Sequence, residues 1–159
     1  MDATRAEIVR KSMIGALING VINAGISGVS FFKQEAVPVT LDHISNHEIT
    51  VFGQGVMLAL MLTLILTGVE FSTVAKGMRK KGAAFHRPFW PWGAKLAVRN
   101  ALTAFGAAMI VAVLWQRFIG TVMVSPLVAT LIMFALAFLF TVYTSMATTL
   151  AMRSAQESA

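Results

Sequence analysis

The stretch SMIGALINGVINAGISGVS, residues 12–30, decides the fold, because it is apolar enough to enter a bilayer and yet carries two asparagines near its centre. At about 100° per residue, small and polar side chains gather on one side of such a helix. They are Ser12, Ala16, Asn19, Gly20, Asn23, Ala24, Ser27 and Ser30. The other side holds Ile14, Ile18, Val21 and Val29. An amide in lipid needs a partner, so we expect the polar side to face other helices or a wet cavity.

The composition indicates an integral membrane protein. Of 159 residues, 57% are hydrophobic and only 13% are charged, whereas roughly a quarter of a soluble domain is charged. The formal net charge of +6 lies mainly beside the apolar stretches, so we expect anionic lipid headgroups as partners rather than nucleic acid. The chain has no cysteine, which excludes disulfides, thiolate metal sites and cysteine nucleophiles.

Four apolar stretches, 8–32, 50–75, 96–115 and 122–152, are long enough to cross a bilayer, which takes ~20 helical residues. They predict an all-α bundle of four membrane helices in a single domain, 1–159. The fourth stretch is longer than a crossing requires, so we expect it to tilt or to project beyond the membrane. Basic residues precede the first stretch as in a signal peptide, but its asparagines interrupt the apolar run, so we expect a retained span.

The distribution of Lys and Arg predicts the orientation of the bundle. Of 13 such residues, the first loop has only Lys33 and the third has only Arg117. The other eleven flank the termini and the second loop: Arg5, Arg10, Lys11, Lys76, Arg79, Lys80, Lys81, Arg87, Lys95, Arg99 and Arg153. We therefore expect both termini and the second loop to be cytoplasmic, in a bacterial inner membrane.

The two halves of the chain share a plan. Each half begins with Val-Arg and ends with Met-Arg, at Val9-Arg10, Val98-Arg99, Met78-Arg79 and Met152-Arg153. Two weakly related helical hairpins would form a parallel repeat of the kind that some transporters use, although unrelated four-span bundles reach the same plan. The third loop is short, and Ser125-Pro126 suits an N-cap and the first helical residue, so we predict a tight hairpin there.

The first loop carries a weak metal motif. His43 and His47 have the four-residue spacing that brings two ligands together on a helix. Ser45 to Glu48, however, resembles a capping box for the second span, which would place His43 before that helix begins. We therefore favour a solvated acidic loop over a metal or pH-sensing site. Residues 36–40 should be extended, because Pro38 disfavours a helix before it.

Asn19 and Asn23 are the first candidates for a functional site. Amides and small residues commonly join membrane helices, and Ala16, Gly20 and Ala24 form a small-residue row beside them. The alternative is a permeation path lined by the two amides. We favour packing, because such polar contacts in membranes are common and modest.

Glu70 is the second candidate, as the only acidic residue well inside a span. It shares a narrow stripe with Thr63 and Thr67, on the order of 10 Å from the centre of its helix. A carboxylate there is unfavourable unless it is paired, hydrated or protonated. Lys11, Arg99 and Asn100 occur at similar depth on the neighbouring spans, among other groups. A structural ion pair and a carboxylate that handles protons or cations are equally compatible with this position.

Two further stripes predict close helix packing. The third span carries Ala97, Ala101, Ala104, Ala108 and Ala112 on one side. The fourth span carries Thr130, Thr141, Thr144, Ser145 and Thr148 on one face, where hydroxyls can bond their own helix carbonyls.

The second loop predicts a membrane-surface anchor. It combines a basic run with an aromatic, proline-rich segment, and Trp is enriched at headgroup level. The residues that we expect to contact lipid headgroups are Lys80, Lys81, Arg87, Trp90 and Trp92.

These features favour a permease- or channel-like subunit that moves a small polar solute or ion. One copy has few helices to enclose a path, so we expect a homo-oligomer. The sites would be Asn19 and Asn23 as lining amides, with Thr63 and Thr67 beside the coupling carboxylate Glu70. The alternatives are an accessory subunit of a larger membrane complex and a lipid-binding or lipid-active protein. No nucleophile–base pair and no cofactor motif stands out, so we expect no cofactor and favour a non-enzymatic role.

Overall fold

A computed structural model describes residues 3–41, 49–80, 82 and 85–157. It contains four long helices, which three connections join. They are α1 (Ala3–Phe31), α2 (Val51–Lys80), α3 (Ala94–Phe118) and α4 (Pro126–Glu157). All four contain a stretch that is long and apolar enough to cross a membrane, which confirms the predicted all-α, four-span bundle.

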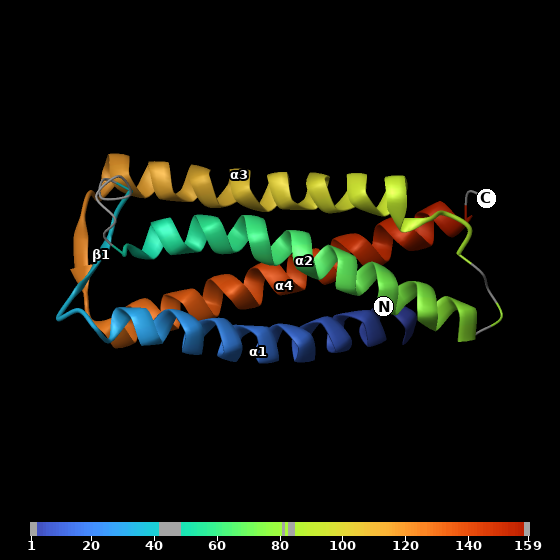
Figure 1. Cartoon of the computed structure of the whole chain (residues 1–159), viewed down its shortest axis with the longest axis horizontal. Coiled ribbons are helices and arrows are strands. Elements are labelled where there is room, and N and C mark those ends of the chain that lie inside the picture. The colour runs from blue at the N-terminus through green and yellow to red at the C-terminus, as the bar shows by residue number, and fades with distance from the viewer. Residues whose placement is uncertain (1–2, 42–48, 81, 83–84, 158–159) are drawn as a thin grey trace.

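The bundle has two different ends (Figure 1). At the end that we call the ribbon end, strands β1 (Val37–Val39) and β2 (Val122–Val124) pair. At the other, the termini end, α1 begins, α4 ends and the connection from α2 to α3 runs (Figure 1). All four helices run between these two ends.

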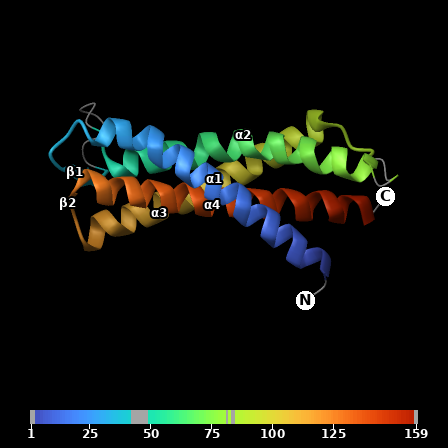
Figure 2. The same ribbon diagram turned by 90° about the horizontal axis from the view of Figure 1, so that it is seen from below.

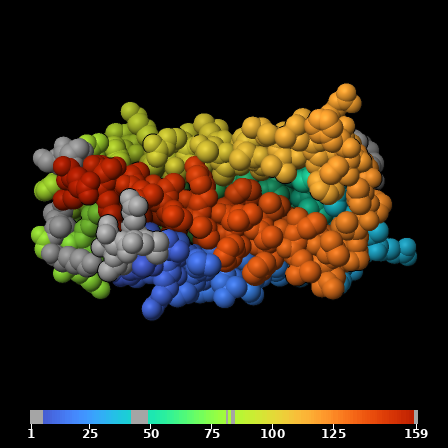
Figure 3. Space-filling model, turned by 180° about the vertical axis from the view of Figure 1, so that it is seen from behind, coloured from blue at the N-terminus to red at the C-terminus, as the bar shows by residue number. Residues whose placement is uncertain are grey.

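The helices pack in the order α1, α4, α2, α3 (Figure 1). Helix α1 packs along α4 and crosses it obliquely (Figure 2). From behind, α4 lies between α1 and α3 (Figure 3). Helices α3 and α4 share few contacts, so the short connection between them does not lead to two closely packed helices. The connection is short as expected, but its strand pairs with β1 and leads α4 away from α3.

The ribbon links the α1–α2 connection to the α3–α4 connection. Its strands are antiparallel, with Pro38 opposite Met123. The extended conformation predicted around Pro38 is confirmed. The fourth helix, in contrast, begins at Pro126 rather than at residue 122, because the β-branched valines of β2 are extended. The Ser125 hydroxyl accepts a hydrogen bond from the Val128 backbone N–H at 3.4 Å, so Ser125 is the N-cap as predicted.

Helix α2 differs from its prediction at both ends. Its N-cap is Thr50, whose Oγ1 accepts a hydrogen bond from the Gly53 backbone N–H at 2.9 Å. The predicted capping box, like His43 and His47, lies outside the described residues. At the other end the helix continues to Lys80, so most of the basic run predicted as loop is helical. Cations in a last turn stabilise the helix, because they oppose the negative end of its dipole.

Helix α3 ends where Gly120 adopts a φ of +80°, a conformation that side chains other than glycine rarely tolerate. The Trp115 indole N–H donates to the Gly120 carbonyl at 3.1 Å and fixes this turn. The ring of Trp115 also packs edge-on against Phe52 of α2, with ring centroids 5.8 Å apart.

The predicted faces of the helices are confirmed in the main, but Asn19 and Asn23 on the small and polar side of α1 are only half-buried. On α1 the isoleucines and valines of the apolar side are exposed. Its small side faces α4, where a Cβ added to Gly20 would lie 2.8 Å from the Phe134 ring, so this glycine permits the close approach. The alanine stripe of α3 is largely buried. At the ribbon end a buried apolar cluster consists of Phe31, Val37, Val39, Val51, Ala129 and Met133, with Thr40 and Thr50 also buried there.

Candidate functional site

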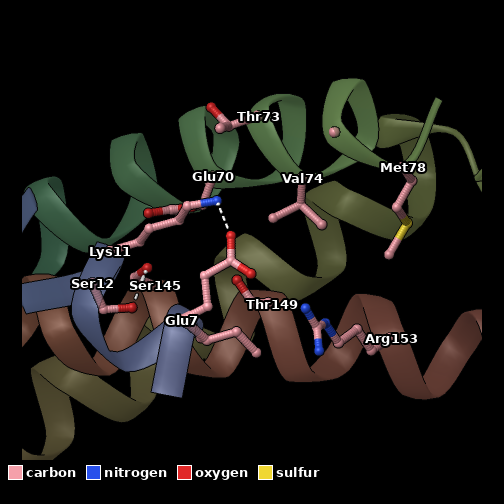
Figure 4. A pocket seen from close by; sticks show the side chains of 12 residues that line it. Glu7, Lys11, Ser12, Glu70, Thr73, Val74, Met78, Ser145, Thr149 and Arg153 are labelled. Atoms are coloured by element: carbon pink, nitrogen blue, oxygen red, sulfur yellow. Dashed lines mark hydrogen bonds and ion pairs between the residues drawn. The ribbon is translucent and has the colours of Figure 1, made fainter. Parts of the chain in front are cut away.

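A pocket of about 420 Å³ opens between α1, α2 and α4 in the termini half of the bundle (Figure 4). Its volume lies within the range of small-molecule sites, roughly 300–1,000 Å³. Its apolar walls include Ile8, Val74 and Met78. Its charged and polar lining comes from all three helices: Glu7, Lys11, Ser12, Glu70, Thr73, Ser145, Thr149 and Arg153.

The pocket carries two carboxylates and two cations, which three helices contribute. On α1, Lys11 Nζ lies 2.8 Å from Glu7 Oε1, one helical turn away. Glu70 on α2 and Arg153 on α4 are both half-buried. Within the described part of the chain, neither of these two forms a salt bridge. A carboxylate inside a spanning helix is unfavourable unless it is paired, hydrated or protonated, so Glu70 requires water or a cation in this pocket.

Ser12 and Ser145 hold α1 against α4 at the wall of the pocket. Their hydroxyl oxygens are 2.8 Å apart, and both residues are buried. In Figure 4 the side chains of Ser12 and Ser145 meet on one side of Glu7, and Thr149 lies on its other side. The serine pair thus gives the pocket a hydrogen-bonding wall that also fixes the crossing of two helices.

A second group of polar residues lies next to the pocket, in the interior of α2, α3 and α4. We call it the threonine–asparagine cluster; it consists of Thr63, Thr67, Asn100 and Thr148, each with no exposed surface. The Asn100 amide Nδ2 donates to Thr67 Oγ1 at 3.4 Å and to Thr148 Oγ1 at 3.3 Å. The Thr67 hydroxyl in turn donates to the Thr63 carbonyl at 2.8 Å. The cluster adjoins the pocket along two helices, because Thr67 is one turn from Glu70 and Thr148 precedes Thr149.

The hydrogen bonding of this cluster is incomplete. Among the described residues, the side-chain oxygens of Thr63 and Asn100 are buried without a partner. A buried polar group left unpaired disfavours the folded state by about 1–3 kcal/mol. Native proteins satisfy nearly all such groups, so an exception calls for an explanation such as a function or a bound polar molecule. The two oxygens are therefore acceptors whose hydrogen-bonding capacity is unused within the described structure.

The structure places the predicted site residues in two separate regions. Thr63, Thr67 and Glu70 share one face of α2 as expected, with the threonines in the cluster and Glu70 in the pocket. Asn19 and Asn23 lie half-buried on α1 and do not line the pocket. The Asn23 side-chain amide donates to the Asn19 carbonyl at 2.8 Å, within its own helix.

The predicted headgroup anchor is partly an internal packing element. Trp92 belongs to η2 (Phe89–Gly93), a short kinked segment that precedes α3 and in which the Trp90 backbone is extended; the Trp92 ring packs against Phe71 and Phe85. Arg87 lies 5.8 Å above the centre of the Trp92 ring. Trp90, in contrast, is 77% exposed. Lys80 is exposed at the end of α2, and Lys81 lies outside the described residues.

Two residues gain importance from the structure. Asn100 was distinguished in the sequence only by its depth, yet it connects α2 and α4 through the cluster. A stronger signal was present, since Asn100 is the only amide within 96–115 and lies on the alanine stripe. Arg153 contributed only to the orientation, because nothing in its local sequence predicts that α4 packs beside Glu70.

No family model matches the chain, and neither the curated proteins nor the solved structures give a match. In the parts of the chain that the structure describes, no three His, Asp or Glu side chains gather as metal ligands. The function must therefore be argued from the pocket and the cluster themselves.

Proposed function

We propose that the chain is a permease-like membrane subunit that moves a small polar or charged solute. The observation that carries this proposal is a charged pocket that lies one helical turn along α2 from a buried polar cluster, in which two side-chain oxygens have no partner among the described residues. Polar and ionisable groups inside a membrane are rare, and they commonly mark substrate or ion pathways. Structural packing alone does not require a carboxylate and unpaired oxygens in the same region.

The solute would enter from the termini end, which we place in the cytoplasm of a bacterium because most basic residues lie there. Toward the ribbon end, the interior is filled by apolar side chains such as Phe31 and Met133. No open pore is therefore expected, and passage requires the helices to rearrange so that the cluster becomes accessible from the other side. This behaviour is that of a carrier with alternating access.

The exposed features of the bundle favour an assembly. The half-buried Asn19 and Asn23 amides would face lipid in a single copy, and an amide in lipid is unfavourable without a partner. A second copy would cover them, and so would a larger membrane protein, which is the accessory-subunit alternative. Lys80, Arg87 and Trp90 would rest against anionic headgroups on the cytoplasmic side. The mass of the particle extracted in mild detergent separates the two assemblies.

Flux through the purified full chain tests the proposed function. Proteoliposomes are shifted into iso-osmotic solutions of glycerol, glycine, phosphoethanolamine or sodium chloride, and their swelling is followed by light scattering. At least one solute should enter several times faster than into protein-free liposomes. The variant Asn100→Leu should abolish the difference, while Arg99→Gln, an exposed neighbour on the same helix, should leave it unchanged.

The proposal is wrong if correctly inserted, helical protein accelerates none of these solutes. Circular dichroism and the protein-to-lipid ratio verify insertion in the same samples. If a stoichiometric second protein accompanies the chain and no flux occurs without it, the accessory role replaces the permease.

A further inference from the structure

We propose that the pocket between α1, α2 and α4 binds a zwitterion, with its cationic amine on Glu70 and its anionic phosphate or carboxylate on Arg153. As a statement about the transported substrate, this inference rests on the proposed function. As a statement about binding, it stands on the pocket itself.

The charged side chains of the pocket that have no ion-pair partner among the described residues indicate the kind of ligand. Lys11 is engaged with Glu7 at 2.8 Å, so this pair is already neutral. Glu70 and Arg153 remain, and within the described residues neither has an ion-pair partner. They project from α2 and α4 at different sides of the pocket (Figure 4). A ligand with a single charge would compensate only one of them, whereas a zwitterion compensates both.

The chemistry of each side chain suits one end of such a ligand. A carboxylate accepts hydrogen bonds from the N–H groups of an ammonium ion. Such charge-assisted hydrogen bonds are stronger than those between neutral groups. A guanidinium has a planar set of donors that matches carboxylate or phosphate oxygens in a bidentate manner. Thr149 lines the same space and offers a hydroxyl between these two ends, whereas Thr73 points away and its hydroxyl donates to the Val69 carbonyl at 2.9 Å.

The size and walls of the pocket limit the ligand to a small molecule or a headgroup. The cavity of about 420 Å³ is suited to a ligand with few heavy atoms. Gly77 lines it without a side chain, and an added Cβ there would meet no atom within 4 Å, so space remains beside α2. The apolar walls formed by Ile8, Val74 and Met78 would accept the hydrocarbon part of the ligand.

Two sources supply this chemistry. One is a soluble zwitterion such as an amino acid, and the other is the ethanolamine headgroup of a membrane phospholipid. The pocket lies at the end of the spans, where both have access. The shared requirement is an amine and an acidic group on one molecule.

The binding experiment has two arms with the purified full chain. In the first, isothermal titration in detergent compares phosphoethanolamine and glycine with ethanolamine alone and inorganic phosphate alone. In the second, native mass spectrometry compares retention of a phosphatidylethanolamine with that of a phosphatidylglycerol of the same acyl chains. We expect one zwitterion, free or lipid-borne, to bind at least about tenfold more tightly than its single-charge counterparts.

Variants identify the site. Glu70→Gln and Arg153→Gln should each weaken the zwitterion at least about tenfold. The matched controls Glu157→Gln and Arg99→Gln remove exposed charges that do not line the pocket and should change nothing. If a pocket variant fails to fold, the comparison of ligands on the unmodified chain still decides the question.

Binding in the first arm identifies a soluble ligand, binding only in the second identifies a lipid, and either supports the inference. The absence of binding in both arms overturns it. So does equal affinity for phosphate alone, or unchanged affinity in folded Glu70→Gln and Arg153→Gln variants. Solute flux without zwitterion binding would leave the proposed function standing alone. Binding without any flux would retain the site and reject the permease.

Discussion

The ribbon end and the termini half of the bundle use the same helices for opposite purposes. At the ribbon end the core is apolar and close-packed, and the fully buried Thr40 hydroxyl donates to Gln116 Oε1 at 2.9 Å. In the termini half a pocket opens between α1, α2 and α4, and near the middle of α2 the fully buried Thr63 hydroxyl has no partner within the described structure. The contrast separates a region whose polar groups are hydrogen-bonded from a region in which some buried polar groups have no partner among the described residues.

The largest expected effect comes from opening a cavity at the ribbon end. Phe31→Ala removes a fully buried ring and should lower the free energy of unfolding by about 3–5 kcal/mol. Thermal unfolding in detergent, followed by circular dichroism, measures the change. The adjacent Phe32 is 65% exposed, so Phe32→Ala should have little effect. Equal losses in both variants would show that the ribbon end is not the stable region.

The variant Asn100→Leu, in the threonine–asparagine cluster, should affect solute flux much more than stability. It removes one unpaired oxygen together with two long hydrogen bonds, so the free energy of unfolding should change by no more than about 1 kcal/mol. Solute flux should fall by about tenfold or more, because a buried group that the solute must bond contributes about 1–3 kcal/mol. A variant that loses stability and keeps its flux would show that the cluster is structural.

The smallest effect is expected from two buried threonines that differ in hydrogen bonding. Thr40→Val removes bonds to Gln116 and Thr121 and should destabilise the protein by about 1–2 kcal/mol. Thr63→Val removes a hydroxyl without a described partner and should be neutral or slightly stabilising. The same unfolding assay compares both variants. A large loss for Thr63→Val would reveal a bond that the free chain needs.

Features that depend on local sequence were predictable. The span of α1, the alanine stripe of α3, the cap at Ser125 and the extended segment around Pro38 each follow from neighbouring residues. Residues 122–124 were not, because their valines continue the apolar pattern of the next helix and only pairing with β1 makes them a strand.

The arrangement of the helices was not predictable from local patterns. The packing of α1 on α4 depends on contacts between the first and last helices of the chain, such as the bond between Ser12 and Ser145. For the same reason Arg153 could not be assigned to the pocket of Glu70. The stripe of Thr63 and Thr67 was visible, but its partners on α3 and α4 became apparent only in three dimensions.

The ribbon has a mechanical consequence. Its paired strands tie the α1–α2 connection to the α3–α4 connection, whereas in the termini half α1 is held against α4 by contacts such as the bond between Ser12 and Ser145. Helix α1 has 29 residues, which corresponds to a lever of about 44 Å. A tilt of about 5° about the ribbon would displace the far end by about 4 Å, enough to close or widen a pocket of this size. The chain has no cysteine. Single cysteines introduced into the termini halves of α1 and α2 would therefore carry labels that report the separation of the two helices, without labelling elsewhere in the chain.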